Sequence, residues 1–414
     1  MATVVTALMI EMLAHWLVKP SKNAFGILLG LELPPRRIVS HSEPGPFQNP
    51  VAPFRKMIVD GKQITSGDLW GHFRLDPVIG YVYQENVTSR NGWWQSNNLG
   101  ARARTNVSRA VPAGRTRVLV FGESFGHGSR LPQERAWPNV IGDQHQELEV
   151  LNFAVDGYSM AQSLLRYRQI RKQLKYEIAL LVFVPEEDLW RDINTLRQLR
   201  DPSWEMPLMP RFVISDGELQ LVPVLYPDPF DLYRRNGDGL SPELRAYLRR
   251  YDRLYFPAKY EEHPVTGKLM LYKLLARALW VQQERRLRAN LMNPEGEALI
   301  VSRAIFDAMR QQVTADGAAF VLVILPSEYH WWSGTTKQSR LQDWRRMVSF
   351  VCAEPMVCID LLPELRSLAP KQVDRTYDGH FGPKMNLWIA TAVHNALKVR
   401  LSIPLPKTEA VDVN

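Results

Sequence analysis

The chain contains only two cysteines among its 414 residues, Cys352 and Cys358. Two cysteines are too few for a metal-ligand framework or a network of disulfide bridges. They flank the turn between an expected helix and an expected strand, where an oxidising compartment would allow them to pair. We predict two free buried thiols instead, because an unpaired cysteine behaves as a small apolar side chain.

Nucleic-acid-binding motifs are also missing. The net charge is +8, but no zinc-finger, RNP or helix-turn-helix pattern accompanies the excess of lysine and arginine. Basic charge without such a pattern indicates solvated arginine-rich faces, and attraction to anionic lipid or acidic polysaccharide remains open. We therefore expect no nucleic-acid partner.

A long apolar run is missing as well. The most apolar stretch, residues 3–18, carries Glu11 and His15, and no lysine or arginine precedes it as in a secretory signal. It is shorter than the roughly 20 residues that span a membrane. A second apolar patch covers residues 24–33. A helix lying on a membrane and a helix packed on the protein body both remain open; we expect residues 1–30 to be helical and membrane-associated.

From residue 117 onward, continuous apolar runs alternate with helical stretches. Five runs have the length and composition of buried strands, and they cover residues 117–121, 150–155, 178–184, 319–325 and 356–361. Buried strands that alternate with helices form parallel sheets through right-handed crossovers. The pattern predicts an α/β fold, a three-layer α/β/α sandwich with a five-stranded parallel sheet of flavodoxin-like order.

A long segment interrupts this alternation between the third and fourth strands. It contains a hairpin signal at residues 211–224 with Asp216-Gly217 at the turn, followed by charged helical stretches. We interpret it as a lid or a partner surface. The expected units are an N-terminal apolar helix with a linker arm, a first core part, the insertion, and a second core part, covering residues 1–60, 61–189, 190–300 and 301–414.

The first strand ends at Gly122, and Ser124 follows within the sequence GESFGHG. This position puts the hydroxyl at the carboxyl edge of the sheet, where open α/β sheets bind ligands. Taken alone, Ser124 is an ordinary helix N-cap, the serine of a G-x-S-x-G elbow, or a nucleophile in another fold. The elbow is disfavoured because Ser124 follows the first strand.

A nucleophilic serine needs a histidine base that a carboxylate orients. Asp378 lies two residues before His380. Alternate residues of an extended segment point the same way, so these side chains can hydrogen-bond and leave one imidazole nitrogen for Ser124. His127 has no carboxylate next to it in the sequence, and His330 is interpreted as a loop residue.

Three motifs together resemble the SGNH, or GDSL-type, hydrolase superfamily. They are Gly122-Glu123-Ser124-Phe125, Gly157 after the second strand, and Asp378-Gly379-His380-Phe381 before the final helix. Upstream, Asp76, Gly80 and the segment from Asn97 to Arg102 are similar to the lead-in of bacterial members with an N-terminal anchor. The resemblance covers residues 75–190 and 318–400.

The resemblance implies a serine esterase or acyl transferase that acts on an O-acylated carbohydrate. In such an enzyme Ser124 attacks the ester, His380 moves the proton, and Asp378 orients the imidazole. The amides of Ser124 and Gly157 would bind the oxyanion, and no metal or organic cofactor is implied. The resemblance also implies a membrane-associated protein on the extracytoplasmic side of a bacterium. A cytoplasmic location is the alternative.

One position departs from the family pattern. The third family block supplies an asparagine that donates to the oxyanion, and Glu187 stands there. An ionised carboxylate repels an oxyanion, and losing one donor costs about 3–4 kcal/mol. The alternative function is therefore a non-catalytic scaffold or binding subunit of a membrane-associated assembly, with a protein partner on the insertion. Three aromatic residues of the insertion are candidates for stacking on sugars, although we expect buried packing: Trp204, Tyr226 and Trp280.

Overall fold

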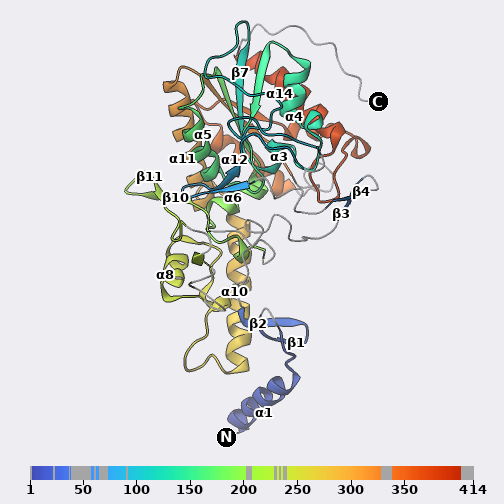
Figure 1. Ribbon diagram of the computed structural model, residues 1–414. Helices are drawn as coiled ribbons and strands as arrows, with labels where there is room; N and C mark the ends of the chain where they lie inside the picture. The colour runs from blue at the N-terminus through green and yellow to red at the C-terminus, as the bar shows by residue number, and fades with distance from the viewer. Residues whose placement is uncertain are drawn as a thin grey trace.

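A parallel sheet forms the centre of the main body of the protein (Figure 1). The structure is a computed structural model that describes residues 2–21, 24–36, 38, 57–59, 62–64, 73–89, 92–201, 208–227, 231–232, 235, 240–327 and 338–401. The sheet strands are β7 (Thr116–Phe121), β8 (Leu148–Asn152), β9 (Ile178–Phe183), β12 (Ala319–Ile324) and β13 (Cys358–Asp360).

The strand order is β13-β12-β9-β7-β8, and every pairing is parallel. Counted along the chain from β7, this is the order 2-1-3-4-5 of flavodoxin-like sheets. All six residues of the central strand β9 are buried, as expected for a strand covered on both faces. The predicted fold class is therefore confirmed.

Helices cover both faces of this sheet (Figure 1). The main ones are α4 (Trp137–Gln144), α5 (Met160–Ile170), α11 (Glu297–Ala315), α12 (Gln338–Val351) and α14 (Pro383–Leu401). α4 packs against α14, and α5 packs against α11. Ser159 begins α5 with a capping box in which its hydroxyl and the Gln162 side chain each bond the other's backbone amide.

Shorter elements complete the body. They are β3 (Met57–Val59), β4 (Lys62–Ile64), β5 (Phe73–Asp76), β6 (Gly80–Tyr83), α3 (Ser124–His127), α6 (Pro185–Asp192) and α13 (Leu362–Leu365). The predicted strand at 150–155 stops at Asn152. There the Asn152 side chain accepts a hydrogen bond from the Ala154 amide and donates to the Gly126 and His127 carbonyls, which tightens the chain into a loop.

The expected hairpin of the insertion is present. β10 (Arg211–Ser215) pairs antiparallel with β11 (Glu218–Val222), and both turn residues, Asp216 and Gly217, have positive φ. The helices α8 (Pro242–Tyr251), α9 (Pro257–Tyr260) and α10 (Met270–Asn290) follow. Tyr226 and Trp280 are both 4% exposed, so they serve packing rather than sugar stacking. Trp204, His330 and most of the linker arm expected toward the end of the unit 1–60 lie outside the described residues.

The N-terminal segment is only partly helical. α1 (Ala2–Leu17) is followed by an antiparallel hairpin of β1 (Ala24–Leu28) and β2 (Leu31–Arg36), so the expectation of a helix throughout residues 1–30 is wrong. Leu29 and Gly30 both have positive φ, which matches the two-residue turn of such hairpins. This hairpin and α1 lie beside α10, at the end of the molecule away from the sheet (Figure 1).

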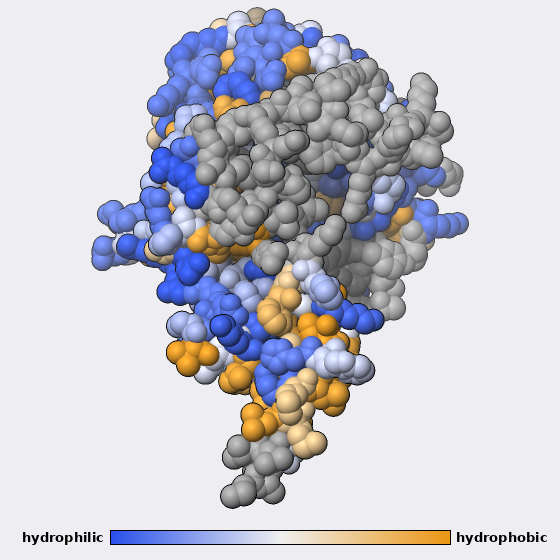
Figure 2. Space-filling model, turned by 60° about the horizontal axis from the view of Figure 1, so that its bottom comes forward, coloured by the Kyte–Doolittle hydropathy of each residue, from blue (hydrophilic) through white to orange (hydrophobic). Residues whose placement is uncertain are grey.

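Glu11 explains how α1 attaches to the body. Its carboxylate accepts hydrogen bonds from the amides of Met270 and Leu271, at the start of α10. A carboxylate at a helix N-terminus satisfies free amides and complements the helix dipole. The opposite face of α1 leaves apolar side chains exposed, and Figure 2 shows apolar residues gathered at this end of the molecule. Among the described residues, no helix combines the length and the apolar character needed to cross a membrane.

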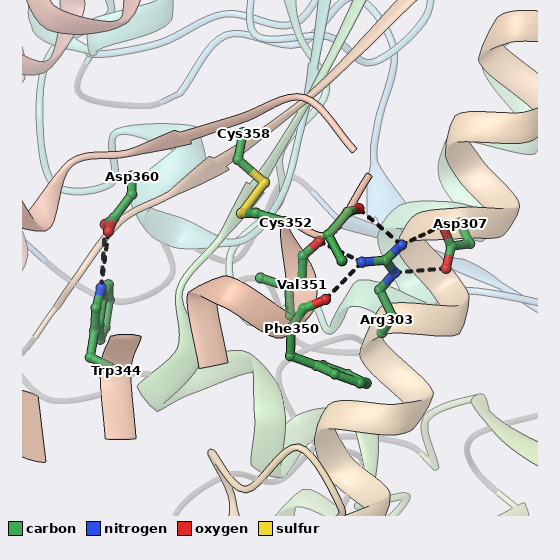
Figure 3. The surroundings of a disulfide bond; sticks show 9 residues. Arg303, Asp307, Trp344, Phe350, Val351, Cys352, Cys358 and Asp360 are labelled. Carbon is green, nitrogen blue, oxygen red and sulfur yellow. Dashed lines mark hydrogen bonds and ion pairs between the residues drawn. A yellow bond between two sulfur atoms is a disulfide. The ribbon is translucent and has the colours of Figure 1, made fainter. Parts of the chain in front are cut away.

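The two cysteines form a disulfide, which contradicts the prediction of free thiols (Figure 3). The bridge joins the residue after α12 to the first residue of β13, with the Cα atoms 5.8 Å apart. The turn is held from outside as well, because Arg303 of α11 donates to the carbonyls of Phe350 and Val351 at 2.7 and 3.1 Å. Apolar burial alone could not reveal this pairing, because it depends on how tightly the turn closes.

Candidate active site

Ser124 lies at the carboxyl edge of the sheet, as the sequence predicts. β7 ends at Phe121, and Gly122 turns the chain with a φ of 146°. A Cβ atom at Gly122 would lie 2.9 Å from the Val182 carbonyl oxygen, so the close approach to β9 requires glycine. Ser124 then opens the short helix α3, and its side chain is largely buried.

The structure brings Ser124, His380 and Asp378 into one line of hydrogen bonds. The distance from Ser124 Oγ to His380 Nε2 is 2.8 Å, and His380 Nδ1 lies 2.9 Å from Asp378 Oδ1. His380 and Asp378 come from the loop before α14, some 256 positions after Ser124. The predicted convergence of these three side chains is observed.

Asp378 is fixed by two further donors. Thr376 Oγ1 donates to its Oδ1 at 2.7 Å, and Arg130 Nε donates to its Oδ2 at 2.7 Å. Burial alone would raise the pKa of Asp378, but the His380 hydrogen bond and the charges of His380 and Arg130 hold this pKa well below its usual value. The carboxylate is therefore ionised at neutral pH and suited to orient an imidazole.

Arg130 is a site residue that sequence reasoning missed. It follows the short helix α3 in a loop where its backbone has a φ of 67°. Besides Asp378, its guanidinium lies 3.5 Å from the half-buried carboxylate of Asp156. The chain has 51 lysines and arginines, and no local sequence pattern distinguishes Arg130 from the others.

Glu123 contacts the candidate nucleophile directly. It is fully buried, its Oε2 lies 2.6 Å from Ser124 Oγ, and its Oε1 accepts from the Phe125 amide at 2.7 Å. The Ser124 hydroxyl has one proton and cannot donate to both Glu123 and His380. Burial raises the pKa of Glu123, against the opposing charge of Arg191 and the Ser124 hydrogen bond. A neutral Glu123 can donate to Ser124 Oγ and leave the serine proton for His380.

Glu187 is paired with an arginine. Its Oε2 accepts from Arg191 Nη2 at 2.8 Å, one helical turn along α6, and its side chain is 35% exposed. The described residues show no hydrogen bond between Glu187 and Ser124. Arg191 also approaches Glu123 Oε2 to 3.5 Å, so this buried guanidinium separates the two carboxylates electrostatically.

The candidate oxyanion donors follow neighbouring strands. The Ser124 amide begins α3 after β7, and Gly157 lies in the loop after β8 with a φ of 76°. Tyr81 supports this loop, because its hydroxyl donates to the Asp156 carbonyl at 2.7 Å. A Cβ atom at Gly157 would lie 2.9 Å from that hydroxyl oxygen, so glycine is required there. The donor roles of both amides stay a prediction.

The lead-in segment supports the loop that follows Ser124. Arg102 is 1% exposed and donates to the carbonyls of His127 and Gly128 at 2.7 and 2.9 Å. Asn97 folds its own segment by accepting from the amides of Leu99 and Ala101. The resemblance alone indicated this segment, and the structure gives it a positioning role.

His127 has a carboxylate nearby in the fold, although none neighbours it in the sequence. Its Nδ1 lies 3.2 Å from Ser129 Oγ and 3.5 Å from Asp156 Oδ1, so a carboxylate that is distant in the sequence is close in space. Burial and the charge of Arg102 lower the pKa of His127 to about 3, although Asp156 opposes the shift. His127 is neutral at physiological pH and packs against Tyr83.

No known family model matches the chain, and no curated protein matches it. Among solved structures it is similar to a protein assigned to the G-D-S-L lipolytic family from Desulfitobacterium hafniense DCB-2, with 11% identity and a TM-score of 0.31 over 68% of this chain and 100% of that one. The acetylxylan esterase Axe2 from Geobacillus stearothermophilus has 9% identity and a TM-score of 0.35, and the match covers 72% of this chain and 100% of Axe2. LAE5, an α/β hydrolase from the Lake Arreo metagenome, has 11% identity and a TM-score of 0.35, and the match covers 69% of this chain and 95% of LAE5.

Likeness at these identities and TM-scores does not establish a shared activity. The sheet order and the line of Ser124, His380 and Asp378 at its carboxyl edge agree with the SGNH-type hydrolase fold that the motifs indicated. What each of these side chains does follows from its geometry in this chain.

The role of Arg130 gives a testable prediction. Arg130→Met should raise the pKa of Asp378 by about 1, because a nearby cation favours the ionised carboxyl. Arg130→Lys should restore most of the original value. The measurement is an NMR titration of ¹³C-labelled aspartate carboxyls, with Arg104→Met as control because Arg104 is an exposed arginine that pairs with Glu134. An unchanged pKa of Asp378 in Arg130→Met would show that Arg130 does not control this carboxylate.

Proposed function

We propose that the protein is a serine ester hydrolase or O-acyl transferase acting on an O-acylated carbohydrate. The single observation that carries the proposal is the continuous line of hydrogen bonds from Ser124 through His380 to Asp378. A serine, a histidine and an ionised carboxylate in this order form the arrangement that activates a hydroxyl for acyl transfer. The carbohydrate part of the substrate rests on the resemblance of the motifs alone.

The proposed reaction has two half-reactions. Ser124 Oγ attacks the ester carbonyl while His380 Nε2 accepts its proton, and the tetrahedral intermediate collapses as His380 gives that proton to the leaving alcohol. Water or a second sugar hydroxyl then attacks the acyl-serine, with His380 again moving the proton. Asp378 stabilises the imidazolium, and the amides of Ser124 and Gly157 bind the oxyanion.

A non-catalytic scaffold is the second candidate, and the acidic residues around Ser124 favour it. Ionised Glu123 would take the hydrogen bond of the Ser124 hydroxyl and compete with His380. Glu187 stands at the position of the family's asparagine, so the site lacks that amide donor. In this interpretation the fold is retained as a binding subunit.

The enzyme hypothesis predicts that Ser124→Ala and His380→Ala each lower kcat on p-nitrophenyl acetate by about a thousandfold or more. His263→Ala is the matched control, because His263 is an exposed residue of the insertion whose bonds stay within its own turn. A folded protein whose hydrolysis rate does not change in Ser124→Ala would contradict the proposed nucleophile. No measurable rate in the unmodified protein would favour the scaffold.

Glu187→Asn separates the two candidate functions. Asparagine would restore an amide donor and remove a negative charge from α6, so the scaffold interpretation, in which Glu187 suppresses hydrolysis, predicts a gain of tenfold or more in kcat/KM, about 1.4 kcal/mol. Glu134→Asn is the control for a general loss of negative charge, since Glu134 lies on the surface. A gain of this size would mean that Glu187 suppresses hydrolysis and would favour the scaffold for the natural chain. A loss of activity would instead mean that Glu187 takes part in the chemistry.

We also propose that α1 and the adjoining hairpin bind a membrane surface. One side of α1 packs through Ala14 against Leu28, Leu33 and Met270. Large apolar side chains are exposed on its other side and at the hairpin tip, and together we call them the apolar patch: Leu8, Met9, Met12, Leu13, Trp16 and Leu29 are 57%, 62%, 65%, 57%, 80% and 81% exposed. So many large apolar side chains at one end suit the acyl boundary of a bilayer, and the net charge of +8 suits anionic lipid.

The disulfide supports a location for this membrane contact. Disulfides persist in oxidising compartments and are rare in the cytosol of most organisms. Cys352 and Cys358 are paired. This favours the extracytoplasmic side over the cytoplasmic alternative.

The membrane proposal predicts that the full chain co-sediments with phosphatidylcholine vesicles containing phosphatidylglycerol at low salt. A Leu13→Ser, Trp16→Ser double variant should bind about tenfold more weakly, because it removes apolar area from the patch. Val399→Ser is the matched control, since Val399 is 81% exposed on α14 in the main body. If the unmodified chain stays entirely in the supernatant, the exposed side of α1 does not bind lipid.

A further inference from the structure

Two histidines and a glutamate meet at the edge of the sheet opposite to Ser124. His145 ends α4, Glu147 directly precedes β8, and His394 projects from α14. Glu147 thus lies at the amino end of a strand, whereas Ser124 follows the carboxyl end of the neighbouring parallel strand β7. The cluster is therefore separate from the candidate active site.

The three side chains are close enough to share one ion. Each offers one nitrogen or oxygen ligand atom, and these atoms all lie within 4.8 Å of one another. His145 Nδ1 and Glu147 Oε1 are 3.7 Å apart, and the two imidazole rings stack with their centroids 3.5 Å apart. His145 and His394 are only 7% and 1% exposed.

Two of the atoms in this cluster have no hydrogen bond. His394 Nε2 and Glu147 Oε1 are both buried, and neither has a hydrogen-bond partner among the described residues. Buried polar atoms are normally paired, because leaving them without a partner loses their hydration without replacement. An unsatisfied imidazole nitrogen and an unsatisfied carboxylate oxygen in one cluster are what an absent cation would satisfy.

We propose that His145, Glu147 and His394 bind one Zn²⁺ ion. Two imidazole nitrogens and one carboxylate oxygen are a ligand set that suits zinc, with water in the fourth position. Magnesium and calcium prefer sets made of oxygen alone. Thiols do not compete as ligands, because both cysteines of the chain are in the disulfide.

Binding requires a change in the two rings. Their planes are 25° apart, so the lone pairs of the stacked rings lie in two nearly parallel planes rather than being directed at one point. Rotation about χ2, a soft torsion in histidine, would turn both nitrogens toward the ion. Glu147 supplies a negative charge for the cation, whereas Lys398, four residues after His394, opposes it.

Both imidazoles are in the protonation state that a ligand needs. Burial, the neighbouring His145 and Lys398 lower the pKa of His394 to about 4. Burial and Lys398 also lower the pKa of His145, although Glu147 opposes this shift. Neutral imidazoles can bind a metal at pH 7 without first losing a proton.

The ion would act as a clamp between α14 and the turn from α4 to β8. α14 begins at Pro383, three residues after His380, and it packs against α4. A clamp at His394 would therefore hold the helix that follows the catalytic loop. Because the cluster is at the opposite edge of the sheet, zinc is expected to stabilise the fold without entering the hydrolytic reaction.

The test uses the full chain without a histidine tag, stripped with a chelator and then dialysed against Zn²⁺. We expect one zinc per chain by elemental analysis and a Tm that rises with zinc but not with Mg²⁺. A His145→Phe, His394→Phe double variant keeps two stacked aromatic rings but no ligand nitrogen, and it should lose both effects. Glu147→Gln should weaken binding by about tenfold or more.

Two control variants locate the ion. His263→Gln and His380→Ala should bind zinc like the unmodified chain, because His263 is exposed in the insertion and His380 belongs to the candidate active site. Loss of zinc in His380→Ala would place the ion at that site and overturn the proposal. Absence of zinc from the unmodified chain, or an unchanged zinc affinity in Glu147→Gln, would also overturn it. Glu147 is partly exposed, so we expect Glu147→Gln to fold. Its zinc affinity therefore tests the proposal even if the double phenylalanine variant does not fold.

Discussion

All five strands of the central sheet run in the same direction, and this constraint decides where the candidate active site lies. Parallel strands need crossover connections, so every carboxyl end and the loop after it meet at one edge. Ser124 follows β7, Gly157 follows β8, and Glu187 lies on the helix after β9. His380 reaches the same edge from the loop after β13, although 256 positions separate it from Ser124.

Arginines that are buried or half-buried then fix the loops at this edge. Arg102 binds two carbonyls at the end of the short helix α3, Arg130 binds Asp378, and Arg191 lies between Glu123 and Glu187. A guanidinium presents several donors in a rigid plane, so one side chain can hold two loops in fixed relation. The same residues set the local electrostatics: Arg130 helps keep Asp378 ionised, while Arg191 only partly offsets the burial of Glu123.

The extension made of α1, the β1–β2 hairpin and α10 follows a different principle. Glu11 caps α10, and a small apolar cluster around Leu33 joins the three elements. One side of α1 therefore packs on the protein. The other side exposes Met12 and Trp16 to the surroundings. The two interpretations of this helix, packed on the body or lying on a membrane, are therefore compatible, because they concern opposite faces.

The sequence by itself determined the parallel α/β fold, the position of Ser124 and the Asp378–His380 pair, because these depend on local signals. Apolar runs mark buried strands, glycines mark the turn, and residues two apart on an extended segment face one way. Only the tertiary structure decided the Cys352–Cys358 bridge, the contact of Glu123 with Ser124 and the role of Arg130. Each of these depends on how tightly a turn closes, how far a side chain reaches, or which loop arrives from elsewhere in the chain. No local pattern carries that information, because the contacts form only when the sheet assembles.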